Sequence, residues 1–289
     1  MKKIFYRNHN QILTDIVKHF EIVEDMKDAD IVMLWNEVMP DTIALINQAR
    51  TLGKKVFTIQ HGRRGSSRYF PPFDSKIISD KLLVWGEADK RRLVEAGHSE
   101  NKIVVVGTTI FSHLKGREKH EGINVVFSPD HWNQEIPENI NVRDELRKLK
   151  GVKVITKIID DQDPIFYDNP VQSNRKEKSH LDICAEVLSR ADLIVSVAEG
   201  TFELMAQALD IPVITVLDWE PKEFGGDARY LQYSRHISSA SKETFLKNLL
   251  KTVRHQLKNG DELAGERQLA CLLEGGINLN CIEEIKKLL

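Results

Sequence analysis

Short apolar runs alternate with amphipathic stretches along almost the whole chain, and this alternation limits the possible folds more than any other feature. Strands separated by helices are typical of βαβ units, whose strands lie parallel. Runs such as Ile103-Val104-Val105-Val106 are apolar at every position, as expected of strands that helices cover on both faces. The sequence therefore predicts an α/β protein built on parallel sheets.

The expected elements form two series with the same rhythm. The first series has strands at residues 4–6, 30–35, 55–59, 81–85 and 102–107, with helices at 11–20, about 41–53 and about 87–96. Asp41 or Thr42 is the expected cap of the second of these helices, which ends at Gly53. The second series has strands at 123–127, 152–159, 193–197 and 213–217, with helices at 141–149, 182–189, 202–209, about 242–258 and 282–289.

The chain has 289 residues, which is enough for two domains with a core each. Residues 113–122 are polar, contain two glycines and have no apolar period, so they are the predicted linker. We expect an N-terminal domain over residues 1–118 and a C-terminal domain over residues 119–289. Both are expected to be Rossmann-like, with parallel sheets that face each other across a cleft. It is left open whether the last helix packs back on the first domain.

The charge balance argues against nucleic acid as a partner. The 41 basic and 43 acidic residues leave a formal net charge of −2, so no global basic field would draw the chain onto nucleic acid or an anionic membrane. No apolar run approaches the ~18 residues that a spanning helix needs, and no apolar segment of a signal peptide follows the N-terminus. The three cysteines lack close pairing and metal-site spacing, which suits the reducing cytosol. We therefore expect a cytoplasmic protein without a transmembrane segment or a metal site.

Ligands of open parallel sheets bind at the carboxyl ends of the strands, so the turns after the strands hold the candidate site residues. The strand at 193–197 enters a small-residue turn, and a helix is expected to begin near Gly200 or Thr201. Free backbone N–H groups and the positive end of the helix favour a phosphate there. Glu203 is placed to accept hydrogen bonds from ribose hydroxyls. The alternative is a plain strand–turn–helix in which Glu203 only complements the helix dipole, and Glu199 opposes phosphate by its like charge.

A second candidate follows the strand at 55–59. His61 has an intrinsic pKa near neutrality, which suits a general base. Three arginines follow it, Arg63, Arg64 and Arg68, and their guanidinium groups are suited to neutralise a phosphate or a carboxylate. The alternative interpretation is a flexible basic surface loop.

A third candidate follows the first strand of the second series, at residues 127–132. Ser128 is suited to bind a phosphate or sugar oxygen, and Trp132 to stack on a base or a sugar. Asp130 and His131 are candidates for contact with a phosphate or an acceptor, and for the general base if His61 is not the base. The alternative is a turn capped by an aspartate.

Several common motifs are absent from the sequence. No GxGxxG follows the first strand, and there is no Walker lysine motif, HExxH, CxxC or GxSxG. A Rossmann oxidoreductase, a P-loop kinase and an α/β-hydrolase therefore lose support.

Three stretches of the chain share a pattern with one superfamily. They are residues 191–214, from Ala-Asp-Leu-Ile-Val-Ser to Pro-Val-Ile, then Gln60-His61-Gly62, and residues 84–107, from Val-Trp-Gly-Glu to Val-Val-Val-Gly. Together they resemble the GT-B glycosyltransferases. They are most similar to the bacterial surface-polysaccharide branch, with its CDP-glycerol glycerophosphotransferases and relatives of UDP-N-acetylglucosamine 2-epimerase. The resemblance covers most of the chain.

The resemblance implies a nucleotide-activated donor of UDP or CDP type, held by the second domain, and an acceptor held by the first. It implies no catalytic metal and no cofactor. Carried over to this chain, it assigns Gly200 and Thr201 to the diphosphate, Glu203 to the ribose and His61 to the base.

Two departures from the glycerophosphotransferases concern the donor. Lys157 stands where that family has a Lys-Pro-His-Pro-like element, but no histidine follows it, and the Ser-rich turn of the family is replaced at 198–201 by Ala-Glu-Gly-Thr. CDP-glycerol therefore loses support as the donor. Lys157 or Arg63 would still add positive charge at the diphosphate.

We therefore expect a metal-independent glycosyltransferase that moves a sugar, or a polyol phosphate, to a cell-surface polysaccharide or a related glycan or lipid-linked acceptor. In the expected mechanism His61 removes a proton from an acceptor hydroxyl, which attacks the anomeric carbon, while the helix near Gly200 holds the leaving diphosphate. An NDP-sugar 2-epimerase and a non-catalytic sugar-nucleotide or glycan binding protein are the alternatives. The oligomeric state, the stereochemical outcome and a peripheral contact with a membrane are left open.

Overall fold

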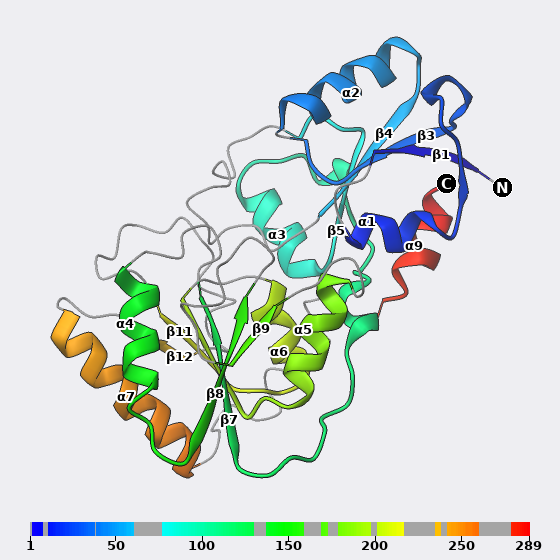
Figure 1. Cartoon of the computed structure of the whole chain (residues 1–289). Helices are drawn as coiled ribbons and strands as arrows, with labels where there is room; N and C mark the ends of the chain where they lie inside the picture. Colours follow the sequence, from blue (N-terminus) through cyan, green and yellow to red (C-terminus); the bar gives the residue numbers. More distant parts are fainter. Residues whose placement is uncertain are drawn as a thin grey trace. The chain divides into compact units, whose positions relative to one another are not determined.

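The computed structural model describes residues 2–7, 11–37, 39–60, 77–129, 137–158, 169–172, 179–197, 201–216, 235–237, 242–259 and 279–289. Contacts divide the chain into two compact units, Met1–Ser112 with Ala270–Leu289, and His113–Leu269 (Figure 1). Each unit contains a six-stranded sheet in which all neighbouring strands pair in parallel. The α/β fold with two parallel sheets, predicted from the alternation of apolar runs, is confirmed.

The sheet of the first unit has the strand order β2-β1-β3-β4-β5-β6. Its strands are β1 (Lys3–Tyr6), β2 (Glu21–Ile22), β3 (Ile31–Leu34), β4 (Lys55–Ile59), β5 (Lys81–Val84) and β6 (Ile103–Val105). Its helices are α1 (Gln11–Val17), α2 (Pro40–Thr51), α3 (Glu87–Glu95) and α9 (Cys281–Leu288). The sequence analysis missed only the short strand β2, which has no apolar run of its own.

The sheet of the second unit has the strand order β12-β11-β10-β7-β8-β9. Its strands are β7 (Ile123–Ser128), β8 (Val152–Ile158), β9 (Pro170–Gln172), β10 (Leu193–Ser196), β11 (Val213–Val216) and β12 (Arg235–Ile237). Its helices are α4 (Pro137–Leu146), α5 (His180–Ser189), α6 (Thr201–Ala208) and α7 (Lys242–Asn259). The sequence analysis missed the two edge strands, β9 and β12, which are short and polar.

Helices cover both faces of the second sheet, and this explains why its central strands are apolar throughout. Helices α4 and α7 lie on one face, and α5 and α6 lie on the other (Figure 1). Leu193 and Val195 of β10 belong to the core that α4 and α7 cover. Ile194 lies between them, so it points to the opposite face, where it is fully buried. No helix within the described residues combines the length and the apolar character needed to cross a membrane.

Helix α2 begins earlier than the sequence indicated. Its N-cap is Met39 and Pro40 follows at once, so neither Asp41 nor Thr42 is the cap. Proline fits the first helical turn because the N–H it lacks would have no partner there. The start of α2 is stabilised by Asn36, whose Oδ1 accepts hydrogen bonds from the Met39 N–H (3.0 Å) and the Thr42 hydroxyl (2.7 Å).

The predicted linker is bound along the second unit, although it forms no strand or helix after residue 113. The Arg117 guanidinium donates to the Ala191 carbonyl (2.6 Å) and to Asp192 Oδ1 (3.0 Å). Arg190 donates in turn to Glu118 Oε2 (2.8 Å). The sequence indicated a segment without apolar periodicity, but its charges are matched to those of the turn between α5 and β10.

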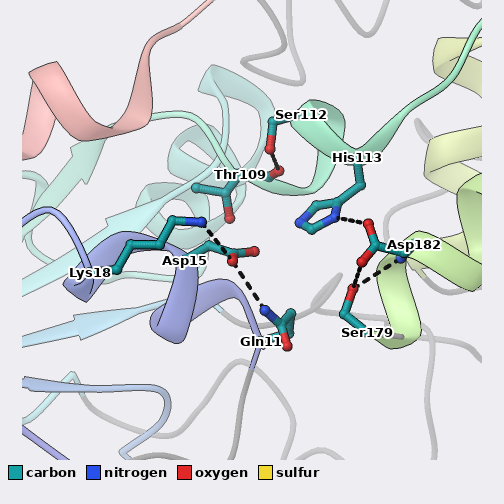
Figure 2. A network of polar contacts seen from close by, with 8 residues as sticks. All are labelled: Gln11, Asp15, Lys18, Thr109, Ser112, His113, Ser179 and Asp182. Atoms are coloured by element: carbon teal, nitrogen blue, oxygen red, sulfur yellow. Dashed lines mark hydrogen bonds and ion pairs between the residues drawn. The ribbon is translucent and has the colours of Figure 1, made fainter. Parts of the chain in front are cut away.

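At its first residue the same segment is tied to the start of α5. His113 Nδ1 lies 2.8 Å from Asp182 Oδ1, and the Ser179 hydroxyl donates to Asp182 Oδ2 (2.6 Å), as the dashed lines in Figure 2 show. Ser179 is also the N-cap, since its Oγ accepts from the Asp182 N–H. Asp182 thus serves both the helix start and the connecting segment. The hydrogen bonds from His113 and Ser179 hold the pKa of the Asp182 carboxyl below its usual value of 3.8.

We predict that Asp182→Asn lowers the free energy of unfolding at pH 7, because the variant loses the charged partner of His113. The loss should be only about 0.5–1 kcal/mol, because the Asp182 side chain is 45% exposed and solvent screens the pair. A carboxyl whose folded pKa is depressed stabilises the fold above its unfolded pKa and loses this effect as the pH falls through the folded pKa. The difference between wild type and variant should therefore shrink as the pH is lowered below the usual pKa of 3.8. Urea unfolding from pH 7 to pH 3 measures it, and equal stabilities at pH 7 would contradict the assignment.

Candidate functional site

Three polar side chains form a row at the carboxyl edge of the second sheet. Ser196 at the end of β10 pairs in register with Ser128 at the end of β7. Phe127 pairs with Thr156 of β8, so the next residues along these strands, Ser128 and Lys157, are neighbours. All three residues lie at the same phase of the strand alternation, opposite the face of α4 and α7. The row therefore lies under the helices α5 and α6.

Helix α6 begins directly above this row. Its first residue is Thr201, which confirms the predicted start of a helix near residue 200. Glu203 in its first turn is only 2% exposed, and its Oε1 accepts a hydrogen bond of 2.6 Å from the Ser196 hydroxyl. The Glu203 carboxylate is thus held against the sheet by a charge-assisted hydrogen bond. Its predicted contact with a ribose stays a prediction.

Lys157 is the unusual member of the row. It is only 9% exposed, and its ammonium nitrogen lies 5.3 Å from the centroid of the Phe202 ring. Within the described part of the chain it forms no hydrogen bond or ion pair. Lysine is rarely this buried without a partner, because an uncompensated charge away from water is costly. An anion brought to this edge would lie near a positive charge that no described carboxylate contacts.

The charges of Lys157 and Glu203 both affect the pKa of the buried Cys184 thiol on α5. Burial raises the pKa of Cys184, the Lys157 ammonium lowers it, and the Glu203 carboxylate raises it. Both charges therefore lie within electrostatic range of the Cys184 thiol.

The first sheet has its own polar residues at the carboxyl ends of the strands. Gln60, at the end of β4, accepts from the Trp85 backbone N–H through Oε1 (3.0 Å), and the Trp85 indole donates to the Gln60 carbonyl (2.8 Å). Both residues are about 1% exposed. This pair fixes the point from which the chain leaves toward His61. After β3, the buried Glu37 carboxylate accepts from the N–H groups of Ile78 and Ser79.

Of the predicted site residues, the structure describes Ser128, Lys157, Thr201 and Glu203, and it brings the strand ends of Ser128 and Lys157 together with the first turn of α6. The others, His61, Arg63, Arg64, Arg68, Asp130, His131, Glu199 and Gly200, lie outside the described residues. Their predicted roles stay predictions.

The sequence analysis did not assign three residues that organise these edges: Ser196, Phe202 and Trp85. A signal existed for Ser196, because it is the polar last residue of an otherwise apolar strand. For Phe202 and Trp85 the signal was weak, since a buried aromatic residue is more often only part of a core. Within the described residues no three His, Cys, Asp or Glu side chains gather as metal ligands would.

Comparison with known proteins gives structural matches alone. No protein-family model and no curated protein matches the sequence. HepE from Anabaena, solved with UDP and glucose, is 9% identical with a TM-score of 0.65, over 100% of this chain and 99% of that one. A glycosyltransferase from Rickettsia africae is 14% identical with a TM-score of 0.58, over 98% and 88% of the two chains. UDP-GlcNAc 2-epimerase from Neisseria meningitidis, bound to UDP-GlcNAc, is 12% identical with a TM-score of 0.53, over 99% and 90%.

The fold is GT-B-like. The two units with parallel sheets, predicted from the sequence to be Rossmann-like, match the fold of solved structures such as HepE over the whole chain.

We predict that Ser196→Ala lowers the free energy of unfolding by about 1.5–3 kcal/mol, because it removes a hydroxyl that donates to a buried carboxylate. Ser79→Ala is the matched control. Ser79 is also fully buried, but its hydroxyl donates to a neutral carbonyl, that of Lys81, so its loss should cost about 0.5–1.5 kcal/mol. Denaturant unfolding of both variants tests this, and equal losses would show that the Glu203 carboxylate does not depend on Ser196.

Proposed function

We propose that the chain is a glycosyltransferase that takes a sugar from a nucleotide-activated donor held at the carboxyl edge of the second sheet. The observation that carries the proposal is the buried ammonium of Lys157 at the first turn of α6, which forms no hydrogen bond or ion pair with the residues that the structure describes. A helix start presents N–H groups that lack partners within the helix, and its dipole favours an anion. A lysine and a helix start together are suited to the diphosphate of a nucleotide sugar.

The donor is proposed to be a UDP-sugar. Structures similar to this chain contain UDP with glucose, in HepE from Anabaena, and UDP-GlcNAc, in the epimerase from Neisseria meningitidis. In this chain Gly200 and Thr201 are the proposed backbone contacts of the diphosphate, and Ser128 a hydroxyl contact. Glu203 is the proposed partner of the ribose hydroxyls.

The proposed chemistry is substitution at the anomeric carbon. His61 accepts the proton of an acceptor hydroxyl, and the hydroxyl oxygen forms the new bond to the anomeric carbon. The bond from that carbon to the diphosphate oxygen breaks, and its electron pair stays on the diphosphate. Positive charge from Lys157, or from Arg63, stabilises the leaving group. This electrostatic effect is expected to contribute more to the rate than the removal of the proton by His61. The proposed acceptor is a glycan of the cell surface or a lipid-linked precursor.

A second function is favoured by one comparison. The similar chain from Neisseria meningitidis is a UDP-GlcNAc 2-epimerase, so the same fold supports a reaction at C2 of the sugar. In this chain the proposed nucleotide-sugar site at the second sheet would serve either reaction. Incubation with UDP-sugars separates the two functions, because transfer releases UDP in step with glycosylated acceptor, whereas epimerisation changes the sugar.

We predict that Lys157→Met weakens binding of UDP by roughly 10- to 100-fold, the equivalent of losing one charge-assisted hydrogen bond. Uridine, which has no phosphate, should bind both forms with about equal affinity. Lys153→Met is the matched control, because Lys153 lies on the same strand but is exposed. Calorimetric titration measures all three proteins. An unchanged affinity of Lys157→Met for UDP would contradict the proposed diphosphate site.

We predict that His61→Ala lowers kcat by roughly 10²- to 10⁴-fold, the usual range for loss of a general base, and leaves the dissociation constant of UDP nearly unchanged. The reason is that His61 belongs to the first unit, whereas the proposed donor site belongs to the second. Steady-state kinetics with a donor and acceptor pair that the wild type turns over provides the test. A variant that keeps the wild-type rate would exclude His61 as the base and leave Asp130 and His131 as the next residues to substitute.

A further inference from the structure

Among the described residues, the Lys157 ammonium contacts an aromatic ring, where a carboxylate would be expected. Buried lysines are normally paired with an acidic group, since an unpaired charge is costly. Here the ammonium lies over Phe202, which is only 5% exposed and belongs to the first turn of α6. A cation within about 6 Å of a ring centroid is attracted by the negative face of the ring, and the observed 5.3 Å meets this condition.

The Glu203 carboxylate is adjacent in the sequence but does not form an ion pair with the Lys157 ammonium. Glu203 follows Phe202 in the sequence, but its Oε1 takes the hydrogen bond from Ser196, and no ion pair links Glu203 to Lys157. The difference matters for a ligand. A carboxylate in contact with the ammonium would neutralise it and compete with an incoming phosphate. An aromatic ring fixes the position of the ammonium and leaves its full charge available.

We propose that Phe202 is a positioning residue, which holds the Lys157 ammonium at the strand ends of the second sheet without a contacting carboxylate among the described residues, so that a diphosphate becomes its counter-ion. This inference rests on the proposed function, because it names the device that prepares the proposed donor site. Phe202 acts through Lys157 and has no chemical step of its own. Its contribution should therefore appear with ligands that carry phosphate and disappear when Lys157 is removed.

The first test compares the affinities of UDP and uridine in Phe202→Leu and Phe202→Met, which both replace the ring by an apolar side chain. We expect UDP to bind roughly 3- to 10-fold more weakly to each variant, within the range of a desolvated cation–π contact. Uridine should bind with unchanged affinity. Met205→Leu is the matched control, since Met205 is a fully buried apolar residue of the same helix. Loss of UDP and uridine affinity by the same factor would reduce Phe202 to a packing residue and overturn the proposal.

The second test is a double-mutant cycle with Lys157→Met. If the ring acts by holding the ammonium, Phe202→Leu should have no effect on UDP binding once Lys157 is methionine. The same loss in both backgrounds would overturn the proposal, whatever its size.

Inorganic pyrophosphate separates this inference from the proposed function. If the wild type binds pyrophosphate and Phe202→Leu weakens that binding, while no nucleotide binds, then the proposed function fails and the role of Phe202 stands. If UDP binds the wild type and both Phe202 variants equally, then the role of Phe202 fails and the proposed function stands. If the wild type binds neither pyrophosphate nor UDP, both are wrong.

Discussion

Parallel pairing of the strands is the constraint on which the candidate site depends. In a parallel sheet the carboxyl ends of all strands meet at one edge, so residues distant in the sequence become neighbours there. The register of β10, β7 and β8 places Ser196, Ser128 and Lys157 side by side on one face of the second sheet. A shift of one residue in either pairing would turn one of these side chains to the face of α4 and α7. The chemistry of this edge is therefore set by the packing of the apolar strands behind it.

The carboxylate and the ammonium at this edge have different partners. The Ser196 hydroxyl donates to the Glu203 carboxylate, and the Phe202 ring lies beneath the Lys157 ammonium. Both contacts come from the first turn of α6, whose own N–H groups favour negative charge. One helical turn thus orders three electrostatic features at once. For the proposed transfer, such an arrangement would need little reorganisation when charge develops on the leaving group.

The sequence predicted most of the fold, because the apolar runs of the buried strands are long and their helices are amphipathic. The edge strands β2, β9 and β12 are short and carry polar residues, so hydrophobic periodicity could not reveal them. The cap of α2 was misplaced because Asn36 reaches it from outside the helix, through contacts that spacing does not show. The same limit applies to the site. Glu203 could be selected by residue type and position, and Lys157 by the family resemblance, but the Ser196 and Phe202 partners depend on register and on the direction of side chains.

Amide hydrogen exchange with and without UDP tests the central claim most directly, that the carboxyl edge of the second sheet binds the nucleotide diphosphate. The account predicts that UDP slows exchange in peptides covering residues 193–208, which contain the end of β10 and the start of α6. It predicts the same for peptides covering the ends of β7 and β8, and little change at the corresponding strand ends β3 and β5 of the first unit. The result that would contradict the account is bound UDP with protection confined to the first unit and none at residues 193–208.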